Sequence, residues 1–256
     1  MPKSNSQFKN NQKAKAQFST WLDLLAMAGW GILLIKLWLS DQLYLLIHPN
    51  YRPLTIVAGL VLILFAAILA WQIKHKPLSS LPHQSYLLPQ WSSGLLISTA
   101  LLGLIISPRP FGGDTAFHRG VGEQINAVRS VESFRANSKS EERSLLEWIR
   151  TLNVYPEPDA YQGQKVKVSG FVVHPPDLSE QFFLITRFVI TCCAADIYPI
   201  SLPVKLESGT RNAYPRDRWL EIEGQMITET LDNRRQLTIA ATKLTPIPEP
   251  KNPYET

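Results

Sequence analysis

Charged residues are scarce in the first part of the chain. Residues 21–107 carry only six charged side chains, whereas residues 108–256 carry thirty-seven, of which 18 are basic and 19 acidic. Residues 1–107 hold eight basic and two acidic side chains, so the positive net charge of the chain, +5, comes from this part and is lowered by one in the rest. This split excludes a single soluble globule, and the slightly acidic polar half excludes a basic nucleic-acid-binding domain. We expect a membrane part, a polar part and no nucleic-acid partner.

Catalytic and nucleotide-binding motifs are absent as well. The sequence has no catalytic-triad pattern, no P-loop and no glycine-rich nucleotide motif. It also lacks the CxxC and HxxxH spacings that are typical of zinc sites. We therefore predict that the protein is not an enzyme.

Two hydrophobic runs are long enough to cross a bilayer, which needs about 20 apolar helical residues. Leu54–Ile73 contains no charge, and Trp21–Leu39 carries Asp23 and Lys36 near its ends. Charges near the ends of a span can reach the headgroup region, although an ionisable residue in a membrane can also form an ion or proton relay. Both runs are predicted to be transmembrane helices in the lipid bilayer.

A third span is predicted over residues 86–107, where Gly94–Ile106 forms the apolar centre. The alternative is a re-entrant or interfacial segment. Lysines lie in the N-terminal tail and in the loop after the second run, which favours a cytoplasmic location for both. Three spans then place the C-terminal half on the extracytoplasmic side, whereas the C-terminal half stays in the cytoplasm if the third segment does not span. The predicted organisation is a cytoplasmic basic tail (1–20), a three-helix membrane domain (21–107), a helical linker (108–160) and an extracytoplasmic β-domain (161–250).

The linker contains two predicted helices. The first covers 117–134, and the second follows a capping-box pattern at Ser138 and Glu141. Asp114 and His118 have the spacing of two metal ligands on one helical turn. Two ligands are too few for a site, so solvated polar side chains are the alternative.

The β-domain has five stretches of strand-like sequence, and short curved strands of this kind indicate an OB-like five-stranded barrel. An open sandwich is the alternative. Gly170 and Gly224 each follow an alternating apolar and charged pattern, which predicts a bulge or a sharp bend. The predicted strands are Lys165–His174, Phe182–Thr191, Ile197–Leu206, Arg218–Thr228 and Gln236–Leu244.

The two cysteines of the chain are neighbours, Cys192 and Cys193, and Asp196 follows them. Adjacent Cα atoms are about 3.8 Å apart, closer than the usual disulfide separation, so a bond between them would be strained. Three interpretations stay open. The thiols can bind a soft or borderline metal ion with Asp196, form a redox-active vicinal disulfide, or be buried as small apolar side chains. His174 is the only histidine close to them in sequence.

Three segments resemble the YcgQ-like family of bacterial membrane proteins. They begin at Tyr161 (YQGQKVKVSGFV), Phe188 (FVITCCAADIYP) and Asp217 (DRWLEIEG). The resemblance implies one subunit of a two-component permease, whose partner is a larger membrane subunit. We therefore expect a non-enzymatic accessory subunit that binds a metal or a thiol-reactive solute. An envelope thiol-redox protein and a purely structural adaptor are the alternatives.

Overall fold

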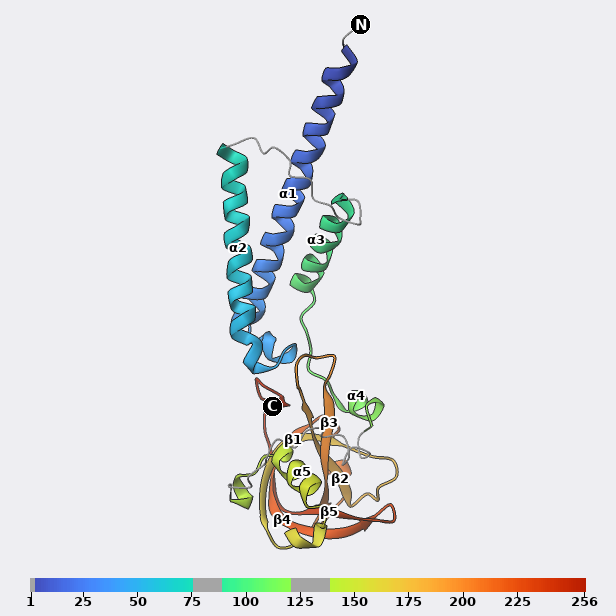
Figure 1. Cartoon of the computed structure of the whole chain (residues 1–256). Coiled ribbons are helices and arrows are strands. Elements are labelled where there is room, and N and C mark those ends of the chain that lie inside the picture. Colours follow the sequence, from blue (N-terminus) through green and yellow to red (C-terminus); the bar gives the residue numbers. More distant parts are fainter. Residues whose placement is uncertain (1–2, 76–88, 121–138) are drawn as a thin grey trace. The chain divides into compact units, whose positions relative to one another are not determined.

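The computed structural model describes residues 3–75, 89–120 and 139–256. They form two compact units, each drawn in Figure 1. The first unit contains Met1–Leu43 and Pro49–Pro108, and the second contains Tyr44–His48 and Arg109–Thr256. The short segment between the first two helices therefore belongs to the unit that contains the sheet.

The described part of the first unit contains three α-helices: α1 (Lys3–Leu39), α2 (Arg52–His75) and α3 (Pro89–Ile105). Within it, Phe18–Leu39 and Pro49–His75 are long and apolar enough to cross a membrane, with mean hydropathies of 1.7 and 2.7. These two segments contain the first two runs identified in the sequence, and they are the candidate membrane spans of the described residues.

The prediction of a third transmembrane helix is wrong. It extended the apolar centre back to residue 86, but α3 begins at Pro89 and has 17 residues. Proline is favoured at the first position of a helix, where its missing N–H costs nothing. At 1.5 Å per residue α3 is about 25 Å long, shorter than the roughly 30 Å hydrocarbon core. It is a short apolar helix that falls below the length of a candidate span.

Two polar contacts fix α3 along α1. The Ser93 hydroxyl, in the first turn of α3, donates to the carboxylate of Asp23. The Lys36 ammonium donates to the Leu104 carbonyl at 2.6 Å, where the last turn of α3 has carbonyls without helical partners. From the first contact to the second, residue numbers rise along both helices, so α1 and α3 are parallel. Both charges near the ends of the run Trp21–Leu39 have partners on α3.

The second unit combines short helices with a mixed sheet. Its α-helices are α4 (Gly113–His118) and α5 (Leu145–Val154), and its strands are β1 (Lys165–Val173), β2 (Phe182–Val189), β3 (Tyr198–Leu206), β4 (Trp219–Leu231), β5 (Arg234–Pro246) and β6 (Tyr254–Glu255). Within the residues that the structure describes, the short 3-10 helices of both units are η1 (Gln42–Leu45), η2 (Pro49–Tyr51), η4 (Ser140–Glu142), η5 (Pro158–Tyr161) and η6 (Arg211–Ala213).

The capping box of α5 lies six residues after the one expected from the sequence. Ser144 accepts a hydrogen bond from the Glu147 N–H at 3.2 Å, and the Glu147 carboxylate accepts one from the Ser144 N–H at 2.8 Å. Ser144 and Glu147 have the same spacing as Ser138 and Glu141. The helix that they cap, α5, buries Leu145 and Trp148. The other predicted linker helix, 117–134, lies mostly outside the described residues.

The sheet has six strands in the order β1-β4-β5-β3-β2-β6, and β1 also pairs with β2. The predicted five-stranded OB-like barrel is therefore corrected to a six-stranded mixed sheet, in which β3 pairs with β5 and β2 with β6 in parallel. The five longer strands lie within a few residues of the predicted ranges. The sixth has only two residues after a proline, too few to produce an alternating pattern.

Alternating side chains of the strands fill two apolar clusters on opposite faces of the sheet. On β1, Val172 belongs to the cluster that packs against α5, while Phe171 and Val173 belong to the cluster that includes Ala116 of α4. Four phenylalanines of β1 and β2 are buried: Phe171, Phe182, Phe183 and Phe188.

Gly224 lies at an irregularity between β4 and β5, as the sequence predicts for one of its two strand glycines. Glu223 pairs with Lys243, whereas Gly224 pairs with Ala241, so β5 has one extra residue there. A Cβ atom on Gly224 would lie 2.1 Å from the carbonyl oxygen of Ala240. Only glycine allows the two backbones to approach this closely.

We expect Gly224→Ala to lower the free energy of unfolding of the β-domain by roughly 1–3 kcal/mol, because the new methyl group forces the bulge apart. The exposed neighbour Gln225→Ala is the control and should change stability by less than about 0.5 kcal/mol. Scanning calorimetry of the purified full chain measures both. Equal melting temperatures for the two variants would contradict this account of the bulge.

Candidate functional site

The candidate site lies in the loop that joins β2 to β3. Asp196 shapes this loop, because its carboxylate accepts hydrogen bonds from the N–H groups of Cys192 at 2.9 Å and Cys193 at 3.1 Å. The Thr191 hydroxyl donates to the same carboxylate. An aspartate that binds backbone groups a few residues before it stabilises a turn in preference to a continuing strand. The backbone therefore leaves the strand at the cysteine pair.

This turn brings the two thiols to the same side. On a regular strand, the side chains of neighbouring residues face opposite sides of the sheet. Here the Sγ atoms of Cys192 and Cys193 are 3.6 Å apart. These sulfurs and a carboxylate oxygen of Asp196 lie within 4.8 Å of one another. The structure thus brings together all three residues that the sequence suggested as metal ligands.

Both thiols are accessible to some degree. Cys192 is exposed and Cys193 is half-buried, and both are free cysteines. The interpretation of this pair as apolar packing residues predicted buried side chains, which does not fit Cys192. An accessible thiol pair is instead available to a metal ion or a reactive solute from the solvent.

The carboxylate of Asp196 is strongly acidic. Burial alone would raise its pKa, but hydrogen bonds from the Thr191 hydroxyl, the Cys192 thiol and two backbone N–H groups outweigh burial and lower the pKa to about 2. Asp196 is therefore negatively charged throughout the physiological pH range. A fixed negative charge beside two thiols favours the approach of a cation.

The same charge holds the Cys192 thiol in its protonated form. Its hydrogen bonds to Asp196 and Cys193, together with the adjacent carboxylate charge, raise its pKa to about 11. A protonated thiol is a poor nucleophile, since the thiolate is the reactive species. A bound metal ion would displace this proton, because a coordinating thiol is deprotonated.

Residues far away in the sequence support the loop. The Arg119 guanidinium, which follows α4, donates to the carbonyls of Ile197 at 2.6 Å and Ala195 at 3.3 Å. On the other side, Ile47 forms an isolated antiparallel bridge with Cys193. Neither contact could be predicted from the sequence, because Arg119 falls within the predicted helix 117–134 and Ile47 lies between the two long hydrophobic runs.

The other polar residues considered as ligands lie elsewhere. His174 is buried, and its Nε2 lies 2.9 Å from the Tyr214 carbonyl. Asp114 and His118 are exposed on α4. In the described part of the chain, the one cluster of three or more candidate ligand residues is Cys192, Cys193 and Asp196.

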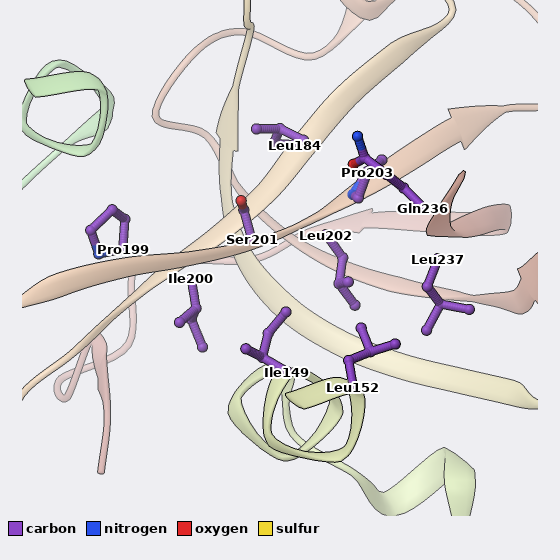
Figure 2. Close-up of a pocket in the computed structure, with 10 residues that line it drawn as sticks. All are labelled: Ile149, Leu152, Leu184, Pro199, Ile200, Ser201, Leu202, Pro203, Gln236 and Leu237. Carbon is purple, nitrogen blue, oxygen red and sulfur yellow. The ribbon is translucent and has the colours of Figure 1, made fainter. Parts of the chain in front are cut away.

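A small apolar cavity lies beneath α5 (Figure 2). It has a volume of about 60 Å³, and Ile149 and Leu152 of α5 face Leu202 and Leu237 of the strands across it. Sites for organic ligands are usually several hundred Å³, so this cavity has room for little more than water-sized molecules. It is a gap in the core packing and does not compete with the cysteine loop as a candidate site.

Comparison with known proteins identifies the family. Residues 22–122 match the DUF1980 N-terminal domain, and residues 126–255 match the DUF1980 C-terminal domain. The chain belongs to the DUF1980 family. No curated protein matches it. The DUF1980 C-terminal domain of this chain contains the cysteine loop and the whole sheet, whereas the bridge residue Ile47 lies in its DUF1980 N-terminal domain.

We expect Asp196→Asn to speed alkylation of Cys192 at pH 8 by about tenfold or more, because removing the carboxylate charge lowers the thiol pKa and raises the thiolate fraction. The rate of reaction with iodoacetamide is measured in a Cys193→Ser background, so that only one thiol reacts. Asp177→Asn, an exposed aspartate of the same domain, is the control. An Asp196→Asn rate equal to that of the control would contradict the electrostatic account of this thiol.

Proposed function

We propose that this DUF1980 protein is a membrane-anchored, non-enzymatic subunit that binds a soft or borderline metal ion at Cys192 and Cys193. Asp196 contributes an oxygen ligand or orients the loop around the ion. The convergence of the two sulfurs and one carboxylate oxygen within 4.8 Å supports this function most directly. Thiolates select ions such as Zn²⁺ and Cu⁺, and a nearby carboxylate is compatible with Zn²⁺.

The raised pKa of Cys192 favours metal binding over redox exchange. A thiol that attacks disulfides works best with a pKa near the ambient pH. Hydrogen bonds to Asp196 and Cys193 instead raise the pKa of Cys192 to about 11, which leaves little thiolate. A metal ion overcomes this barrier by exchanging with the proton, and the negative Asp196 compensates part of its charge.

The proposed extracytoplasmic location of the site starts from the segment that follows α1. The lysine-rich N-terminal tail favours the cytoplasm, so a span at α1 would place Tyr44–His48 on the opposite side, and these residues belong to the compact unit of the sheet. An extracytoplasmic sheet also requires the chain between α2 and Arg109 to cross the bilayer again, which the two candidate spans alone do not provide. Alkaline phosphatase fused after Thr256 would be active with this sidedness, because the enzyme requires export. An inactive, cytoplasmic fusion would contradict it.

Association with a larger permease subunit is part of the proposal. The resemblance to YcgQ-like proteins suggests such a partner, and two candidate spans provide too little membrane structure for a transport pathway of their own. In this arrangement the β-domain offers the ion or a thiol-reactive solute at the membrane surface, and the partner moves it across the bilayer.

We expect the full chain in detergent, under reducing conditions, to bind one Zn²⁺, and Cys192→Ser/Cys193→Ser to weaken binding by at least about 100-fold. The loss of a single supporting residue around a metal already costs roughly 10–100-fold. The apparent affinity should rise by at least about tenfold per pH unit between pH 6 and 8, because the raised pKa of Cys192 requires release of a thiol proton.

Competition with a chromophoric chelator measures this affinity, with Asp177→Asn as the matched control. If the double serine variant bound Zn²⁺ as tightly as the parent chain, the thiols would not be ligands and the proposed function would be wrong.

A further inference from the structure

The segment between α1 and α2 lies against the cysteine loop, within the same compact unit. Two backbone hydrogen bonds join them: the His48 N–H donates to the Cys192 carbonyl at 3.0 Å, and the Ala194 N–H donates to the Leu46 carbonyl at 2.8 Å. These bonds flank the bridge between Ile47 and Cys193. A short antiparallel pairing therefore runs through the cysteine pair itself.

The register of this pairing places a histidine beside the site. If Ile47 is opposite Cys193, the next residue, His48, is opposite Cys192. The His48 N–H bond to the Cys192 carbonyl keeps the two backbones adjacent, and opposed residues of an antiparallel pair have Cβ atoms about 4.5–5.5 Å apart. An imidazole on such a Cβ is long enough to reach a metal ion that is bound to the opposing sulfur.

The three donors of the loop leave a ligand position to fill. Apart from the bond of the Cys192 thiol, whose proton a metal ion would displace, the two oxygens of the Asp196 carboxylate accept three hydrogen bonds from the loop, including the one from Thr191. A carboxylate has about four lone-pair sites, so Asp196 has little capacity for strong coordination while it shapes the turn. Zinc sites with protein ligands are usually tetrahedral, and imidazole is a common partner of thiolates in them.

His48 is half-buried, and its ring nitrogens are not among the donor atoms that converge in this structure. Coordination therefore requires the imidazole to rotate about its side-chain bonds. The backbone does not need to move, because the bridge already fixes the Cα atom of His48 relative to Cys192.

We propose that His48 is a further ligand of the metal ion held by Cys192 and Cys193. This inference rests on the proposed metal-binding function. The site then draws one ligand from the segment that connects the two candidate membrane spans and two from the β-domain. A bound ion would add a further link between that segment and the β-domain, beside the backbone hydrogen bonds that already join them.

The experiment uses Co²⁺ as the probe ion, added to the full chain in detergent under reducing conditions. Thiolate ligands give a charge-transfer band in the near ultraviolet, and the visible d–d bands report the geometry and the nitrogen ligand. We expect His48→Ala to keep the thiolate band, to change the d–d bands and to weaken Co²⁺ binding by about 10–100-fold. The exposed His118→Ala is the matched control and should leave the spectrum and affinity unchanged.

A second variant tests the position of His48 by adding a ligand, so that the conclusion does not depend on loss of binding alone. In His48→Cys the new thiol lies at the same position, so the charge-transfer intensity should rise by about half, in proportion to three sulfurs in place of two. The role of His48 would be overturned if the spectra of His48→Ala and His48→Cys both matched the parent. The proposed function would stay intact in that case, provided that Cys192→Ser/Cys193→Ser still abolished the thiolate band. A parent chain without any thiolate band would overturn the proposed function itself.

Discussion

The geometry of the cysteine pair depends on the hydrogen bonds that the Asp196 carboxylate accepts from Thr191, Cys192 and Cys193. These bonds turn the chain at the end of β2, where a continuing strand would point the two thiols to opposite faces. Arg119 holds the following carbonyls of the same loop. The site is thus a local turn that residues far away in the sequence keep in place.

The same interaction sets the electrostatics of the site. Asp196 stays negative because the loop hydrogen bonds lower its pKa to about 2, and this charge helps to raise the pKa of Cys192 to about 11. Without a metal ion, the Cys192 thiol is protonated and slow to react. A cation reverses this balance, because it replaces the thiol proton and meets an existing negative charge. The Asp196 carboxylate therefore suppresses the reactivity of Cys192 and favours the binding of a cation.

Sequence reasoning succeeded where the signal is local. The strand positions follow from alternating side chains, Gly224 marks the bulge, and the neighbouring cysteines and Asp196 identify the loop. It failed where the outcome depends on distant contacts or on exact length. The third span was wrong because Pro89 begins α3, and β6 was missed because two residues carry no pattern. His174 was noted as the histidine near the cysteines in sequence, yet His48 is the one placed beside them, through a pairing across 144 to 146 positions.

X-ray absorption at the zinc edge of the full chain, loaded with one Zn²⁺ under reducing conditions, tests the central claim most directly. The account predicts two sulfur neighbours at about 2.3 Å, with nitrogen or oxygen neighbours at about 2.0–2.1 Å. A shell of oxygen and nitrogen alone would contradict it, because the ion would then lie away from Cys192 and Cys193.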